Sequence, residues 1–180
     1  KRNLSHNKST PESLKSYMQD KSIKLFSSLN ILSKREIEAR YIVDLQEYIM
    51  RIQIEARTLG DISRNHIIPT AIKYQNTLIE NVKGIKEIYG SDFKKYANEQ
   101  MSLIKRISEH IAAINSGVNL MIESRKKANK ISNDHKKALE YSNKVLTKMN
   151  PIGYHCDKLE LLVDNTLWPL AKYRELLFSC

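Results

Sequence analysis

The most constraining feature of this chain is an apolar pattern at α-helical spacing that runs from Ser33 to Tyr89. Ser33 and Glu36 have the spacing of a capping box at its start, and Gly90 supplies a stop at its end. Such a helix spans on the order of 85 Å at ~1.5 Å per residue, which is too long for a compact globule. We predict that Pro69 kinks or interrupts it. The apolar positions, three, four or seven residues apart before Pro69, are Ile37, Tyr41, Leu45, Tyr48, Ile52, Leu59 and Ile62, followed by Ile72, Ile79 and Val82.

Two further helices are predicted after this stretch. Ser91 and Asp92 begin the first of them, and the short connection folds it back antiparallel on the preceding helix, as in a helical hairpin. Ser132-Asn133-Asp134 caps the second, and we expect Asn150-Pro151 to end it. The apolar stripe of the first consists of Phe93, Ala97, Met101, Ile104, Ile107, Ile111, Ile114, Val118 and Met121.

Shorter helices are predicted at both ends, over residues 11–20, 21–29, 151–163 and 170–178. Because only five Gly and four Pro occur in 180 residues, few tight turns are available, which favours long helices. We predict an all-α fold, an elongated antiparallel bundle of long helices over residues 33–150. A polar lead-in with short helices (1–32) precedes the bundle and a helical tail (151–180) docks on it, all in one structural domain.

The net charge of +10 is spread evenly along the chain. Residues 1–90 carry 15 basic and 10 acidic side chains, and residues 91–180 carry the same numbers. The densest runs, Lys94-Lys95, Lys105-Arg106 and Arg125-Lys126-Lys127, stand among helical apolar positions and not among stacking aromatics. We interpret them as solvated helix faces, and we expect no nucleic-acid partner.

The cysteines and the apolar runs bear on the cellular compartment. Cys156 and Cys180 form neither a CxxC pair nor a disulfide framework, which predicts a reducing cytoplasm. No apolar run approaches the ~20 residues needed to cross a bilayer, so we expect no membrane partner. The chain starts at KRNLSHNKST without Met, and we expect it to be part of a longer protein.

A cluster of charged side chains on the long helix is the first candidate site. Glu55, Arg57, Asp61, Arg64 and His66 fall within twelve residues. Arg57, Asp61 and Arg64 are three or four positions apart and can pair on one helix face. An acid/base role requires a second converging element, which the sequence does not display. We therefore predict a structural or interface network here, with His66 bonding locally near Pro69.

Other candidate chemistry is weaker. His155-Cys156-Asp157 resembles a triad, but adjacent helical residues point about 100° apart, so we expect a buried Cys156 and no catalysis. The five histidines lack the i, i+4 spacing of a helical zinc site, and the glycines form no phosphate loop. We assign no catalytic, cofactor-binding or metal-binding residue to this chain. Trp168, Tyr173 and Phe178 either anchor the chain in a partner or close its own bundle.

Two stretches carry a resemblance to a known family. The first stretch reads LFSSLNILSKREIEARYIVDLQEYI followed by IQIEARTLGDISRNHIIPTAIKYQNTLIENVKGIKEIYG, and the second is the ending YHCDKLELLVDNTLWPLAKYRELLF. Both resemble the C-terminal helical region of bacterial type III glutamine synthetases. About 150 residues are covered. The catalytic strands of that family would lie upstream, and no residue here matches its metal-binding carboxylates or phosphate-contacting arginines.

The resemblance implies a parent enzyme that joins ammonia to glutamate with ATP and magnesium or manganese. It also implies homo-oligomers of stacked hexameric rings, in which this region adjoins the catalytic domain of the same chain. On this interpretation the region is non-catalytic alone and supports subunit association, or covers or regulates the active site.

The alternative is an independent helical module that binds a protein or a polyanion through its basic excess. Binding to a polyanion weakens steeply as salt rises, whereas an apolar subunit contact persists, so salt dependence separates the two.

Overall fold

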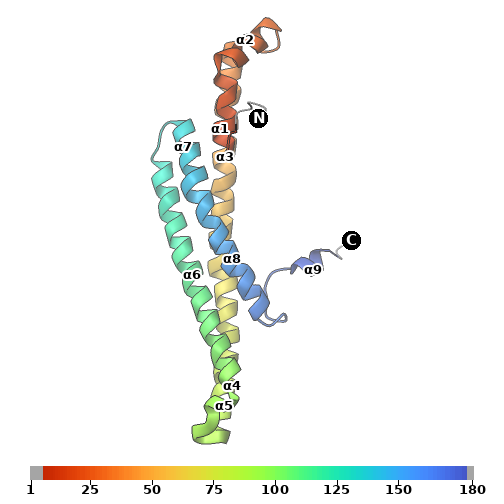
Figure 1. Ribbon diagram of the computed structural model, residues 1–180, viewed down its shortest axis with the longest axis vertical. Helices are drawn as coiled ribbons and strands as arrows, with labels where there is room; N and C mark the ends of the chain where they lie inside the picture. Colours follow the sequence, from red (N-terminus) through yellow and green to blue (C-terminus); the bar gives the residue numbers. More distant parts are fainter. Residues whose placement is uncertain (1–5, 178–180) are drawn as a thin grey trace. The chain divides into compact units, whose positions relative to one another are not determined.

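The computed structural model describes residues 6–177, and for Tyr173 and Arg174 it describes the backbone only. Every regular element in this range is helical, which confirms the predicted all-α class (Figure 1). The chain divides into two compact units, the first made of Lys1–Arg57 and Leu120–Lys148, the second of Thr58–Asn119 and Met149–Cys180. The proposed division into residues 1–32, 33–150 and 151–180 stays a prediction.

The first unit packs the N-terminal helices with parts of the long ones. α1 (Thr10–Leu14) passes into a 3₁₀ turn (Lys15–Met18), and α2 (Asp20–Ser28) and α3 (Lys34–Ile62) follow. The unit also contains the end of α6 (Asn98–Asn129), then α7 (Asp134–Glu140) and a π-helical turn (Tyr141–Leu146). Its core consists of Ile37, Leu45, Ile49, Ile52, Ala56, Met121, Ala128, Ala138, Tyr141 and Val145.

Local caps start the helices of this unit where the sequence predicts them. The Ser33 backbone N–H donates to Glu36 Oε2 at 2.7 Å, and the Glu36 N–H donates to Ser33 Oγ at 3.4 Å. This reciprocal capping box begins α3. The Asn133 side chain accepts from the Lys136 N–H at 2.9 Å and caps α7. Both caps satisfy backbone donors that have no partner inside the helix.

The second unit contains the predicted helical hairpin. α4 (Ile68–Tyr89) leads through a 3₁₀ turn (Gly90–Asp92) and α5 (Phe93–Tyr96) into α6, so the predicted second helix is interrupted at Ala97 (Figure 1). Gly90 adopts φ +55°, and Tyr89 stacks on Tyr96 with ring centroids 4.2 Å apart. The side chain of Gln75 donates to the Ile104 carbonyl and the Ser108 hydroxyl at 2.9 and 2.6 Å, which ties α4 to α6.

Pro69 is accommodated by a π-helical turn. The turn covers Ser63–Ile67, and the Ile68 N–H donates to the Ser63 carbonyl, five residues back. Pro69 has no N–H, and in an α-helix its ring would meet the carbonyl four residues before it. The wider turn relieves this conflict, so helical structure continues on both sides of the proline.

The predicted break at Pro151 is wrong, because α8 (Thr147–Leu162) runs through this proline. A proline inside a helix costs roughly 3 kcal/mol. Ile152, Cys156 and Leu159 are buried along one side of α8 just after it. Tertiary packing of an apolar face supplies most helix stability in proteins, and here it outweighs the local destabilisation caused by Pro151.

The C-terminal helix is also shorter than predicted. α9 covers only Tyr173–Leu176, and Phe178 lies outside the described residues. The Lys172 N–H donates to Glu175 Oε2 at 3.0 Å, and the Lys172 ammonium donates to the Glu160 carbonyl at 2.9 Å. The first bond caps the start of α9, and the second ties the residue before α9 to the end of α8, whereas residues 170–172 are not helical.

Two glycines give a matched test of helix packing in the second unit. A Cβ at Gly117 of α6 would lie 2.9 Å from Cγ1 of the buried Ile152 on α8, whereas a Cβ at Gly84 of α4 would meet nothing within 4 Å. Gly117→Ala should lower the free energy of unfolding by about 1 kcal/mol or more, because overpacking exceeds the gain in helix propensity. Gly84→Ala should raise it by about 0.5–1 kcal/mol.

Urea unfolding followed by circular dichroism measures both changes. In the Gly117→Ala background, Ile152→Ala should cost less than in the original chain, because it removes the clashing atom. Equal costs of Ile152→Ala in the two backgrounds would show that the two helices do not meet at this point.

Candidate functional site

The charged cluster predicted on the long helix is divided between the two units. Glu55 and Arg57 belong to the first unit, whereas Asp61, Arg64 and His66 belong to the second. All are exposed except Arg64, which is half-buried. A contact between Arg57 and Asp61 would join the two units and stays a prediction.

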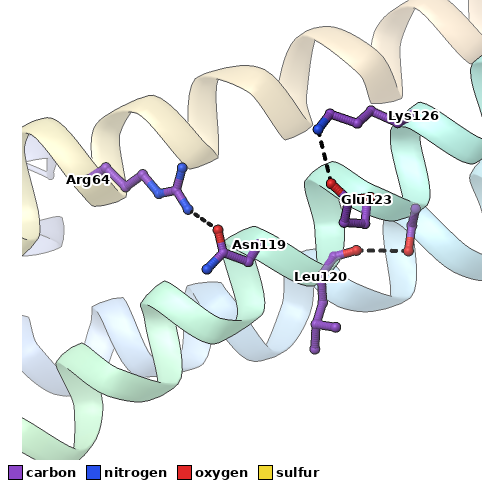
Figure 2. Close-up of polar contacts among 6 residues, drawn as sticks. Arg64, Asn119, Leu120, Glu123 and Lys126 are labelled. Carbon is purple, nitrogen blue, oxygen red and sulfur yellow. Dashed lines mark hydrogen bonds and ion pairs between the residues drawn. The ribbon is translucent and has the colours of Figure 1, made fainter.

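Within the second unit, Asp61 and Arg64 have amide partners. Asp61 Oδ1 accepts from the Asn65 amide at 2.5 Å. Arg64 Nη2 donates to Asn119 Oδ1 of α6 at 2.5 Å (Figure 2). Among residues 6–177, no hydrogen bond or ion pair reaches the His66 side chain. The predicted pair of Asp61 with Arg64 is therefore replaced by bonds that suit helix packing.

Cys156 is buried in the second unit, as the sequence predicts. It is 7% exposed, and its Sγ lies 3.5 Å from the hydroxyl of the fully buried Ser63 in the π-helical turn. Burial raises the pKa of the Cys156 thiol, with the Ser63 hydrogen bond opposing. A raised pKa leaves little thiolate, and the thiolate is the reactive form. Together with an exposed Asp157, this geometry does not provide a nucleophile.

A histidine pair that the sequence analysis missed joins α6 to α8. Nδ1 of His110 and Nδ1 of His155 are 2.9 Å apart, and both rings are half-buried. The two residues are 45 positions apart in the chain, so no local spacing signals the contact. Burial lowers the pKa of His110, and the charge of His155 lowers it further. The hydrogen bond needs one nitrogen without a proton, so the pair cannot carry a proton on both facing atoms.

The aromatic residues of the tail are only partly described. Trp168 is half-buried, and its indole Nε1 is buried without a hydrogen-bond partner among the described residues. The Tyr173 side chain and all of Phe178 lie outside the description. Their assignment to a partner anchor or to the bundle itself stays a prediction.

Ligands for the divalent metal implied by the resemblance do not assemble in the described part of the chain. Within residues 6–177, no group of three or more His, Cys, Asp or Glu side chains is placed to hold a metal ion. The residues present therefore do not fit such a centre. None of the helices in this range has the length and apolar character needed to span a membrane.

The strongest candidate for function is an exposed apolar face on α3 in the first unit. Val43, Met50 and Ile54 are 59%, 54% and 56% exposed. They are seven and four positions apart, so they lie within roughly 60° on one side of the helix. Beside them the Glu47 carboxylate accepts from Arg51 at 2.7 Å. We call Val43, Met50 and Ile54 the α3 face.

The histidine pair predicts a pH dependence of stability. The pKa of His110 is below its ordinary value in the folded state, so the unfolded chain takes up this proton first as pH falls. Stability should be constant above pH ~7 and decrease below pH ~6.5, the ordinary histidine value. His110→Gln should reduce the decrease between pH ~7.5 and ~5.5, a window above the ordinary carboxyl pKa values, and the remainder comes from His135, whose pKa is also lowered.

Urea unfolding at several pH values within this window measures the effect. His66→Gln is the matched control, because this histidine is exposed and outside the pair, and it should keep the original decrease. If the curves of His110→Gln and the original chain coincide, the pair does not govern the pH dependence.

Comparisons with known proteins identify relatives of this chain. Residues 1–86 match the family described as "Glutamine synthetase C-terminal domain". A glutamine synthetase of Bacteroides fragilis (strain YCH46) is 40% identical over 170 residues, which are 94% of this chain and 23% of that protein.

Two other relatives extend the similarity. The type-3 glutamine synthetase of Dictyostelium discoideum is 32% identical over 98% of this chain and 24% of its own length. A glutamine synthetase of Butyrivibrio fibrisolvens is 26% identical over 99% of this chain and 25% of its own length. The chain thus spans about a quarter of the length of these relatives. Residues 1–86 therefore match the glutamine synthetase C-terminal domain family, and the chain resembles the C-terminal helical region of type III glutamine synthetases, as its sequence predicts.

Proposed function

We propose that this chain is the non-catalytic helical region of a type III glutamine synthetase and that it supports association of the enzyme's subunits. The parent enzyme would be a cytoplasmic ligase that joins ammonia to glutamate with ATP and magnesium or manganese. Its catalytic domain would lie elsewhere in the same polypeptide, and its assembly would be a homo-oligomer of stacked hexameric rings. The similarity to glutamine synthetases over most of the chain supports this proposal.

The α3 face is the observation that favours subunit association over the other possible roles. Three large apolar side chains that share one side of a helix and are each more than half exposed are a typical interaction surface. All three lie within the family-matched residues 1–86. The adjacent pair of Glu47 with Arg51 supplies a polar margin, as at the rim of many protein interfaces.

Charge placed on the α3 face tests the proposal. In the full-length enzyme that carries this region, Met50→Asp with Ile54→Asp should dissociate the oligomer, because buried unpaired carboxylates oppose association. Glutamine formation should fall with the oligomer mass. Light scattering and an activity assay on the same samples measure the two quantities.

Ile42→Asp is the matched control. Ile42 is 45% exposed on the same helix, but its position is about 120° around the axis from Ile54. The control should keep both mass and activity. Because all these positions are exposed, the folding stability of each variant should change by only about 0.5 kcal/mol, which thermal unfolding checks.

A truncated enzyme that ends just before Phe26 separates the remaining roles. Loss of both mass and activity supports the assembly role. Unchanged mass with lost activity would instead indicate a lid or a regulatory element. Unchanged mass and activity would overturn both in favour of an accessory binding module.

A further inference from the structure

The first unit contains a cleft of about 720 Å³ that the proposed function does not use. It lies among the N-terminal segment, the 3₁₀ turn Lys15–Met18 and α7, and its lining includes Lys8, Glu12, Lys15, Ser16 and His135. This volume falls within the range of small-molecule sites in proteins, roughly 300–1,000 Å³.

The charges around the cleft favour an anion. Lys8 and Lys15 contribute two ammonium groups to the lining. Among the described residues that line the cleft, Glu12 is the acidic one. Its Oε2 accepts hydrogen bonds from the backbone N–H groups of Lys8 and Ser9 at 3.1 Å each. No ion pair joins Glu12 to Lys8 or Lys15 among the described residues, and the two lysines outnumber this one carboxylate, so the net charge of the three residues is positive.

His135 of α7 adds an imidazole to the lining of the cleft. Its Nδ1 lies 2.8 Å from the Tyr41 hydroxyl of α3, and both side chains are half-buried. Burial raises the pKa of Tyr41, so the hydroxyl keeps its proton at neutral pH. When this hydroxyl donates to Nδ1, the other ring nitrogen, Nε2, carries the hydrogen and can donate.

Lys15 and His135 lie close enough to influence each other. Burial lowers the pKa of His135, and the positive charge of Lys15 lowers it further. His135 is therefore a neutral donor near neutral pH beside a permanent cation. Both groups would stabilise a bound doubly charged anion, because the ammonium supplies positive charge and the imidazole supplies a directional hydrogen bond.

We propose that this cleft binds a small phosphate-bearing anion, held by the ammonium groups of Lys8 and Lys15 and by the Nε2–H of His135. The Ser16 hydroxyl already accepts from the Asn7 amide at 3.3 Å, so its own proton is available as a further donor. The volume exceeds that of a phosphate ion, so the cleft accommodates an organic group as well.

Isothermal titration calorimetry of the full chain with inorganic phosphate, pyrophosphate and glucose 6-phosphate tests the proposal. Pyrophosphate should bind with a dissociation constant in the micromolar to low millimolar range, and acetate should not bind detectably. Lys15→Gln should weaken pyrophosphate binding at least tenfold. Tighter binding of glucose 6-phosphate than of inorganic phosphate supports an organic ligand, and equal binding supports recognition of the phosphate group itself.

Two further variants separate a built site from diffuse attraction. Lys21→Gln, at an exposed lysine of α2 outside the cleft, should leave affinity unchanged. Tyr41→Phe keeps every charge but removes the partner of His135, and should weaken binding severalfold. The proposal fails if no phosphate-bearing probe binds. It also fails if Lys15→Gln and Lys21→Gln weaken binding equally, or if Tyr41→Phe has no effect while thermal unfolding shows all variants folded.

Discussion

The close approach of α8 to α6 is the contact on which much of the second unit depends. Gly117 has no Cβ, and the side chain of Ile152 occupies the space where one would stand, with Cγ1 2.9 Å from the ideal Cβ position. Small residues let helix backbones approach, and close packing then brings neighbouring side chains into contact. The same two helices present His110 to His155 in hydrogen-bond contact. The histidine contact is therefore a consequence of how the backbones meet.

The π-helical turn at Ser63–Ile67 connects local strain to packing in the same unit. Pro69 removes a backbone donor, and the turn before it widens in response. The widened turn contains Ser63, whose buried hydroxyl meets the Cys156 thiol, and Arg64, whose guanidinium meets Asn119. Pro69, which by local preference would break a helix, thus lies close to Ser63 and Arg64, the residues that join three helices.

Both proposed roles of this chain rest on surfaces, because the buried side chains of the described residues are mostly apolar and packed inside the units. Tyr141, for example, is fully buried and donates its hydroxyl to Asn129, and burial raises its pKa. The α3 face lacks such internal partners, since its three apolar side chains are more than half exposed. The N-terminal cleft presents ammonium groups and a held imidazole in the same unit. The two features suit different partners, an apolar protein surface and a phosphate-bearing anion.

The amino-acid sequence alone predicts the all-α class, the capping box of Ser33 with Glu36, the Asn133 cap and the reversal at Gly90. Each of these features depends on residues within one or two helical turns. The sequence also carried the family resemblance. Tertiary structure alone decided that α8 continues through Pro151, since burial of distant apolar side chains outweighs a local penalty. It alone brought His110 to His155 and Tyr41 to His135, which are 45 and 94 positions apart. No periodic pattern encodes such pairs, because helix packing and not sequence spacing sets which side chains meet.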